Sequence, residues 1–104
     1  MKAQFFNTTH LQGDDLAQEI HNAEKQEAAV LALFRNRNRP MSPSMVHREI
    51  EKFGKRWPIT SVRRAMTNLA NEGSLTKTDL QVVGIYSKKE HCWRLPEVQG
   101  ELFG

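Results

Sequence analysis

The sequence has a single cysteine, no long apolar run and no signal-peptide core. Because Cys92 is the only cysteine among 104 residues, an internal disulfide framework and a cysteine-rich zinc site are excluded. The longest uncharged apolar stretch, residues 28–34, is far shorter than the roughly 18 residues of a membrane-spanning helix. We therefore expect one cytoplasmic domain, with Cys92 as a small core residue.

Motifs for catalysis and metal binding are also missing. The chain has no G-x-S-x-G elbow, no glycine-rich phosphate loop and no carboxylate cluster at a predicted cleft, so we expect no enzyme and no cofactor. No two of its four histidines have the i, i+4 spacing of a helical zinc site. His91 and Cys92 would point to opposite faces of a strand. We expect no metal.

Charge is concentrated in the middle of the chain. The net charge is +3, but residues 35–64 carry nine basic and two acidic side chains. Residues 1–34 carry two basic and five acidic side chains, and residues 65–104 carry four and five. A basic centre in a nearly balanced chain favours an anionic partner.

The N-terminal half has helical periodicity. We expect an irregular arm over residues 1–13 and a helix that begins at Asp14-Asp15, where carboxylates favour the N-terminus. Apolar residues then recur as far as Phe34, which fits one long helix or two consecutive ones.

Two further helices and two short strands follow. Ser42-Pro43 is a typical helix start, and the helix it opens stops at Gly54. Residues 59–72 form the next helix, ended by Gly73, with a buried face that contains Ile59, Val62, Met66 and Leu69. Residues 74–78 and 91–95 read as strands joined by a loop over 79–90. The domain thus spans residues 14–96, before a mobile tail over 97–104.

Residues 58–77, Pro-Ile-Thr-Ser-Val-Arg-Arg-Ala-Met-Thr-Asn-Leu-Ala-Asn-Glu-Gly-Ser-Leu-Thr-Lys, resemble the recognition helix and first wing strand of the winged helix-turn-helix superfamily. Their Leu-x-x-x-Gly-x-Leu-x-Lys ending is typical of bacterial and phage regulators. The resemblance covers about residues 25–96. It implies a mostly helical α+β fold with a three-helix core and a β-hairpin wing, here with an additional N-terminal helix. It also implies binding of double-stranded DNA by a small transcriptional regulator.

The helix over 59–72 has a polar side without acidic residues. At about 100° per residue, its apolar stripe points one way and its threonine, arginine and asparagine side chains point the other. Arginine pairs with guanine and asparagine with adenine in the major groove. We expect base reading by Thr60, Ser61, Arg64, Thr67, Asn68 and Asn71.

Phosphate contacts are expected around this helix. Hydroxyls and free amides at the start of the preceding helix favour an anion, and basic residues extend the positive region into the turn and the wing. The predicted phosphate-binding residues are Ser42, Ser44, Arg48, Lys55, Arg56, Arg63, Lys88 and Lys89.

Dimerisation is expected because one short helix reads few base pairs. The acidic N-terminal helix, with Leu16 and Ile20, is the predicted contact. The wing is unusually apolar at Val82, Val83, Ile85 and Tyr86, and either folds back on the domain or packs against a second subunit.

Two alternative functions stay open. Gln99-Gly100-Glu101-Leu102-Phe103 resembles the Gln-x-x-Leu-Phe motif that docks bacterial replication and repair proteins on the sliding clamp. This favours a protein-interaction adaptor in replication, recombination or phage biology, with Gln99, Leu102 and Phe103 as the contact. Trp57 and Trp93 would instead stack on bases in a single-strand binder, although a structural role for both fits the pattern as well.

Overall fold

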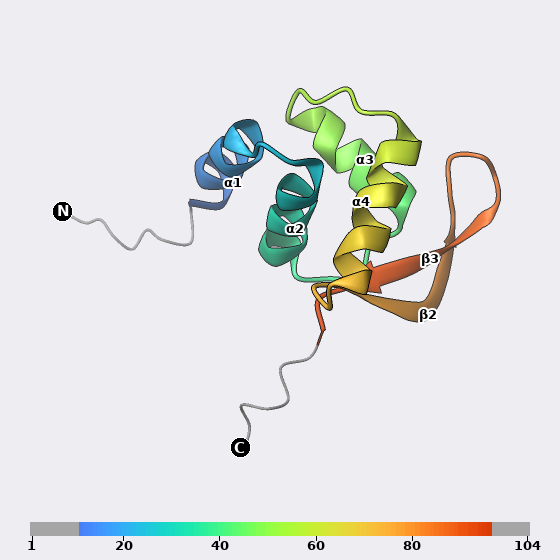
Figure 1. The fold of residues 1–104 in the computed structure, drawn as a ribbon. Helices are drawn as coiled ribbons and strands as arrows, with labels where there is room; N and C mark the ends of the chain where they lie inside the picture. The colour runs from blue at the N-terminus through green and yellow to red at the C-terminus, as the bar shows by residue number, and fades with distance from the viewer. Residues whose placement is uncertain (1–10, 97–104) are drawn as a thin grey trace, which may run out of the picture.

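A computed structural model of the chain describes residues 11–96, with four helices followed by an antiparallel hairpin (Figure 1). The first ten residues of the predicted arm lie outside the described residues, as do Gln99, Leu102 and Phe103. The predicted clamp contact therefore stays a prediction. The elements are α1 (Leu11–Asn22), α2 (Gln26–Arg37), α3 (Pro43–Lys52), α4 (Ile59–Asn71), β2 (Thr76–Val83) and β3 (Lys89–Arg94).

The N-terminal region forms two helices, not one. Helix α1 begins at Leu11, three residues before the predicted start, and ends at Asn22. Residues 23–25 connect it to α2, which begins at Gln26. Leu16 is 2% exposed and Ile20 is fully buried, because both pack in the core that this chain builds with its own helices. The prediction that these two side chains form a dimer contact is therefore wrong.

Helix α3 begins as its sequence predicts. The Ser42 side chain caps it by accepting a hydrogen bond from the Met45 amide at 3.3 Å, and Pro43 occupies the first turn. Val46 and Ile50 are fully buried. Gly54 follows the helix with a φ of +90°, a conformation that favours glycine.

Helix α4 matches the predicted helix closely. It buries Ile59, Val62, Met66 and Leu69, as expected, and Ala65 beside them. Gly73 lies just beyond its end with a φ of +86°. The stripe packs α4 against α2 and α3, which leaves the opposite side of the helix exposed.

The hairpin is longer than predicted. Strands β2 and β3 include most of residues 79–90, which were expected to form a loop, because Val82 pairs with Glu90 and Val83 with Lys89. A register irregularity lies between Lys77 and Gln81. Beyond β2, a short connection over residues 84–88 closes the hairpin, with Ser87 at a φ of +62°. We call β2, β3 and this connection the wing.

The wing is joined to the helices at its base. Met41, just before α3, forms an isolated antiparallel bridge with Trp93 of β3, with both N–H···O distances 2.9 Å. Trp93 and Trp57 are half-buried and pack against the core, and Cys92 is buried. Burial raises the pKa of the Cys92 thiol, and the nearby Glu90 charge adds to this increase.

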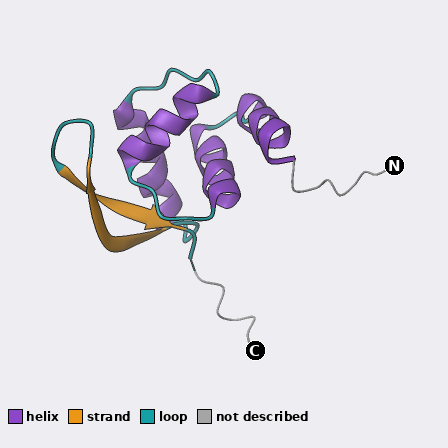
Figure 2. Cartoon of the chain, turned by 180° about the vertical axis from the view of Figure 1, so that it is seen from behind, coloured by secondary structure: helices purple, strands orange, loops and turns teal. Residues whose placement is uncertain are grey.

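The protein is therefore a mostly helical α+β domain, consistent with the predicted winged-helix-like fold. Figure 2 shows from behind that the wing projects from the helical body. Among residues 11–96, no helix is long and apolar enough to cross a membrane.

Phe34 tests the core. Its side chain is fully buried on α2, so Phe34→Ala should lower the free energy of unfolding by about 3–5 kcal/mol. Urea denaturation followed by circular dichroism measures this. The neighbouring Arg35 is exposed, and Arg35→Ala should change the value by less than about 0.5 kcal/mol. Equal effects of the two substitutions would contradict the assignment of Phe34 to the core.

Candidate nucleic-acid interface

The predicted base-reading side of α4 is largely open to solvent. Thr60, Arg64, Thr67 and Asn71 are exposed, while Ser61 and Asn68 are half-buried. No acidic side chain lies on α4 itself. The helix thus presents hydroxyl, guanidinium and amide groups outward, all of which can hydrogen-bond to base edges.

Asn68 already has an acceptor within the protein. Its Nδ2 donates a hydrogen bond to Glu27 Oε2 of α2 at 2.8 Å. Glu24, Glu27, Arg64 and Asn68 all line a cavity of about 620 Å³ between α2 and α4. The side of α4 that faces α2 therefore carries both acidic and basic side chains.

The wing side of α4 is different. Arg63, predicted to contact phosphate, lies 3.3 Å from Glu90 Oε2 through its Nη2 and 5.8 Å from the centre of the Tyr86 ring. Its side chain remains 44% exposed. The carboxylate and the ring hold the guanidinium next to the wing without removing it from solvent.

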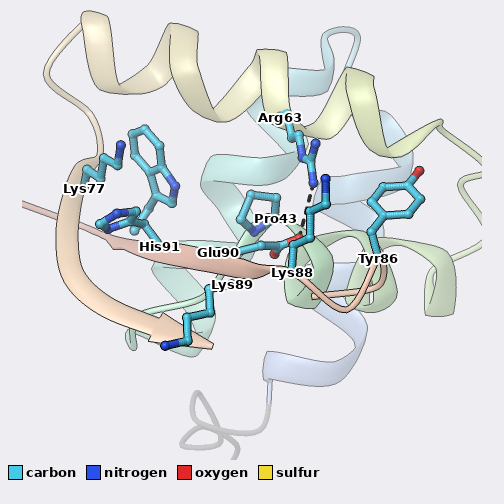
Figure 3. Close-up of a pocket in the computed structure, with 9 residues that line it drawn as sticks. Pro43, Arg63, Lys77, Tyr86, Lys88, Lys89, Glu90 and His91 are labelled. Atoms are coloured by element: carbon cyan, nitrogen blue, oxygen red, sulfur yellow. Dashed lines mark hydrogen bonds and ion pairs between the residues drawn. The ribbon is translucent and has the colours of Figure 1, made fainter. Parts of the chain in front are cut away.

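Beside Arg63, a cavity of about 430 Å³ opens between α3, α4 and the wing, and we call it the wing groove (Figure 3). Lys88 and Lys89, both predicted to bind phosphate, line it together with Arg63. Lys77 also lines it, with its Nζ 5.8 Å from the centre of the Trp93 ring. Lys77 and Lys89 come from the paired strands β2 and β3, in which Lys77 lies opposite Trp93, whereas Lys88 comes from the connection and Arg63 from α4.

Lys77 was missed as a site residue in the sequence because it was assigned only to a strand. The cross-strand position opposite Trp93 is the signal that would have found it. That signal depends on the register of the hairpin. The register could not be assigned from the sequence, because residues 79–90 were predicted to form a loop.

Ser42 and Ser44 do not face solvent. Ser42 is fully buried and Ser44 is 3% exposed. The Ser44 amide donates to Glu90 Oε1 at 3.1 Å, and its hydroxyl donates to Glu90 Oε2 at 2.7 Å. The N-terminus of α3, predicted to contact phosphate, is occupied in this structure by the chain's own Glu90 carboxylate.

Glu90 is the group on which these contacts converge. Its side chain is 8% exposed. Burial raises its pKa, but the opposing hydrogen bonds from Ser44, Ser42 and Arg63 prevail, so the pKa lies below its ordinary value of 4.5. A Cβ at Gly84 would collide with this carboxylate, which explains glycine at that position.

The remaining predicted phosphate residues lie around the turn between α3 and α4. Arg48 and Arg56 are exposed. Lys55 is half-buried, with its Nζ 5.9 Å from the centre of the Trp57 ring. The Trp57 carbonyl also accepts a hydrogen bond from His47 Nε2 at 2.9 Å, which fits a role in sealing this turn.

No protein-family model matches the chain, and its sequence has no significant match among curated proteins. Its fold is similar to that of a possible transcriptional regulator from Methanosarcina mazei Go1, with a TM-score of 0.56 and 14% sequence identity. The match covers 84% of this chain and 68% of the other. At this identity, the comparison supports the fold alone.

The Glu90 contacts predict a pH dependence of stability. Because the pKa is lowered in the folded state, the carboxylate stabilises the fold above its ordinary value of 4.5. This contribution is lost as the pH falls through the lowered pKa. An NMR titration of the Glu90 side-chain carboxyl should therefore give a midpoint below 4.5.

Ser44→Ala is the matched variant. It removes the hydroxyl donor and keeps the backbone donor, so the Glu90 midpoint should rise relative to the wild type. A wild-type midpoint above the ordinary value, or no change in the variant, would contradict the described hydrogen bonds.

Proposed function

We propose that the protein is a small, non-enzymatic regulator that binds double-stranded DNA as a winged helix. Helix α4 enters the major groove, and the wing contacts adjacent backbone. The observation that carries the proposal is the open polar side of α4 directly beside the four cations of the wing groove. The name of the structural neighbour as a possible transcriptional regulator is in line with it.

The roles follow from position. Thr60, Arg64, Thr67 and Asn71 read base edges, because they are exposed along the outward side of α4. The wing supplies the phosphate contacts next to these residues, through Lys77, Lys88 and Lys89. These three cations lie on the wing, not on the helix that enters the major groove of DNA.

Asn68 and Ser44 have a lesser part in this proposal than the sequence had assigned to them. Asn68 donates to Glu27, and the polar groups of Ser44 hold Glu90. The duplex therefore contacts the outward side of α4 and the wing, with Arg64 at the edge of this surface nearest the acidic residues Glu24 and Glu27.

Binding should depend steeply on salt. Each neutralised phosphate contributes about 0.9 to the slope of log affinity against log salt concentration. Lys88→Ala/Lys89→Ala should weaken binding to every duplex alike and lower the slope by about 1 per residue. Fluorescence anisotropy with labelled random duplex at several salt concentrations measures both.

Arg64→Ala should behave differently. On a duplex selected for tight binding from a random library, it should cost about 1–3 kcal/mol and reduce the preference over random duplex. Arg35→Ala is the matched control, since Arg35 is an exposed arginine on α2 that lines neither the wing groove nor the cavity between α2 and α4. The proposal would be overturned if the wild-type protein did not bind duplex at low salt. Equal losses of affinity in Arg64→Ala and Arg35→Ala would also overturn it.

A further inference from the structure

The exposed large apolar side chains of the described residues all belong to the wing. Leu80 is 53% exposed, Val83 69%, Ile85 47% and Tyr86 58%. Exposed apolar side chains grouped in this way mark interaction surfaces. The wing also projects from the helical body, where a partner can reach it (Figure 2).

Three of the four exposed apolar side chains of the wing lie outside the wing groove, although one of them, Val83, is paired with Lys89 and shares a face of the hairpin with it. Tyr86 lines the wing groove with the cations and contacts Arg63. Leu80, Val83 and Ile85 do not line that groove. We call these three residues the edge patch. Because these three residues do not line the wing groove, binding of nucleic acid in that groove leaves the edge patch unexplained.

The backbone of β2 has an edge open to a further strand, although the Leu80 amide itself donates to the Thr78 hydroxyl. Within residues 11–96, β2 pairs with β3 alone, so the other edge of β2 has no strand beside it there. Beyond the register irregularity between Lys77 and Gln81, residues 81–83 of β2 pair regularly with β3. An unpaired edge with exposed apolar side chains is a template for a further strand.

The charges of this segment favour a second copy of the chain over a nucleic acid as its partner. Residues 80–86 contain no charged side chain, so the segment has little attraction for an anion such as nucleic acid. A two-fold antiparallel pairing of β2 with another β2, centred anywhere from Leu80 to Val82, sets Asp79 opposite an uncharged residue. No like charges then face each other in this part of the pair, so the segment is compatible with itself.

We propose that the edge patch binds a second copy of this chain, by antiparallel pairing of the two β2 strands into one continuous sheet. The contact replaces the dimer interface that the sequence had placed on α1, where Leu16 and Ile20 are buried. A single strand pair buries less than the roughly 1,200–2,000 Å² of a stable interface, so the free dimer is weak. The proposal does not rest on the proposed DNA binding.

Sedimentation equilibrium of the full chain without nucleic acid tests the proposal. Wild-type protein should show a reversible monomer–dimer equilibrium. Leu80→Lys/Val83→Lys should raise the dissociation constant about tenfold or more, because it removes apolar contact and brings two added positive charges per chain into the interface. The control Gln18→Lys/Thr76→Lys adds the same charge at exposed positions outside the edge patch and should leave the constant unchanged.

A second measurement needs no variant. On dilution of wild-type protein, amide NMR signals of residues 79–86 should shift together, and those of α1 should not. Wild-type protein that stays monomeric, a dimer insensitive to Leu80→Lys/Val83→Lys, or dilution shifts centred elsewhere would each overturn the proposal. Shifts of 79–86 that occur only on addition of duplex would assign the edge patch to nucleic acid and also overturn it, while leaving the proposed function in place.

Discussion

The carboxylate of Glu90 connects the three parts of the molecule that form the candidate interface. It accepts hydrogen bonds from the Ser44 amide and hydroxyl at the start of α3, and it pairs with Arg63 of α4. Its own position is set by the pairing of β3 with β2, which places it opposite Val82. A negative charge at the partially positive N-terminus of a helix is stabilised there, and the arginine adds a second favourable contact.

Together with the Met41–Trp93 bridge at the base of the wing, this side chain fixes where the wing lies relative to α4. The Ile85 amide donates to the Ser44 hydroxyl at 2.9 Å, so the same serine also fixes the tip of the hairpin. With the tip held, Tyr86 lies beside Arg63, and the Lys88 side chain points toward Arg63 of α4, whereas that of Lys89 points away from it (Figure 3). The position of Lys88 beside α4 thus depends in part on the buried acidic residue Glu90.

The helices could be predicted from the sequence because their signals are local. Ser42-Pro43 caps α3, Gly54 and Gly73 follow α3 and α4 with positive φ, and the apolar stripe of α4 has helical spacing. The same periodicity correctly identified which residues of α4 are buried.

What the sequence could not supply depends on distant contacts. Ser44 and Glu90 are 46 positions apart, and nothing local marks one as the partner of the other. A stripe such as Leu16 and Ile20 has the same pattern whether it covers the chain's own core or a second subunit. The strand ends were misplaced because Val82 and Val83 are paired by register with Glu90 and Lys89, which local propensity does not reveal.

In the proposed function, the interface for nucleic acid lies where α4 meets the wing. Titration of isotope-labelled protein with short random duplex, followed by amide NMR, tests this most directly. The account predicts shifts that concentrate in residues 60–71 and 84–90 and leave α1 unchanged. Shifts centred on α1 and the start of α2, or none at low salt, would contradict it.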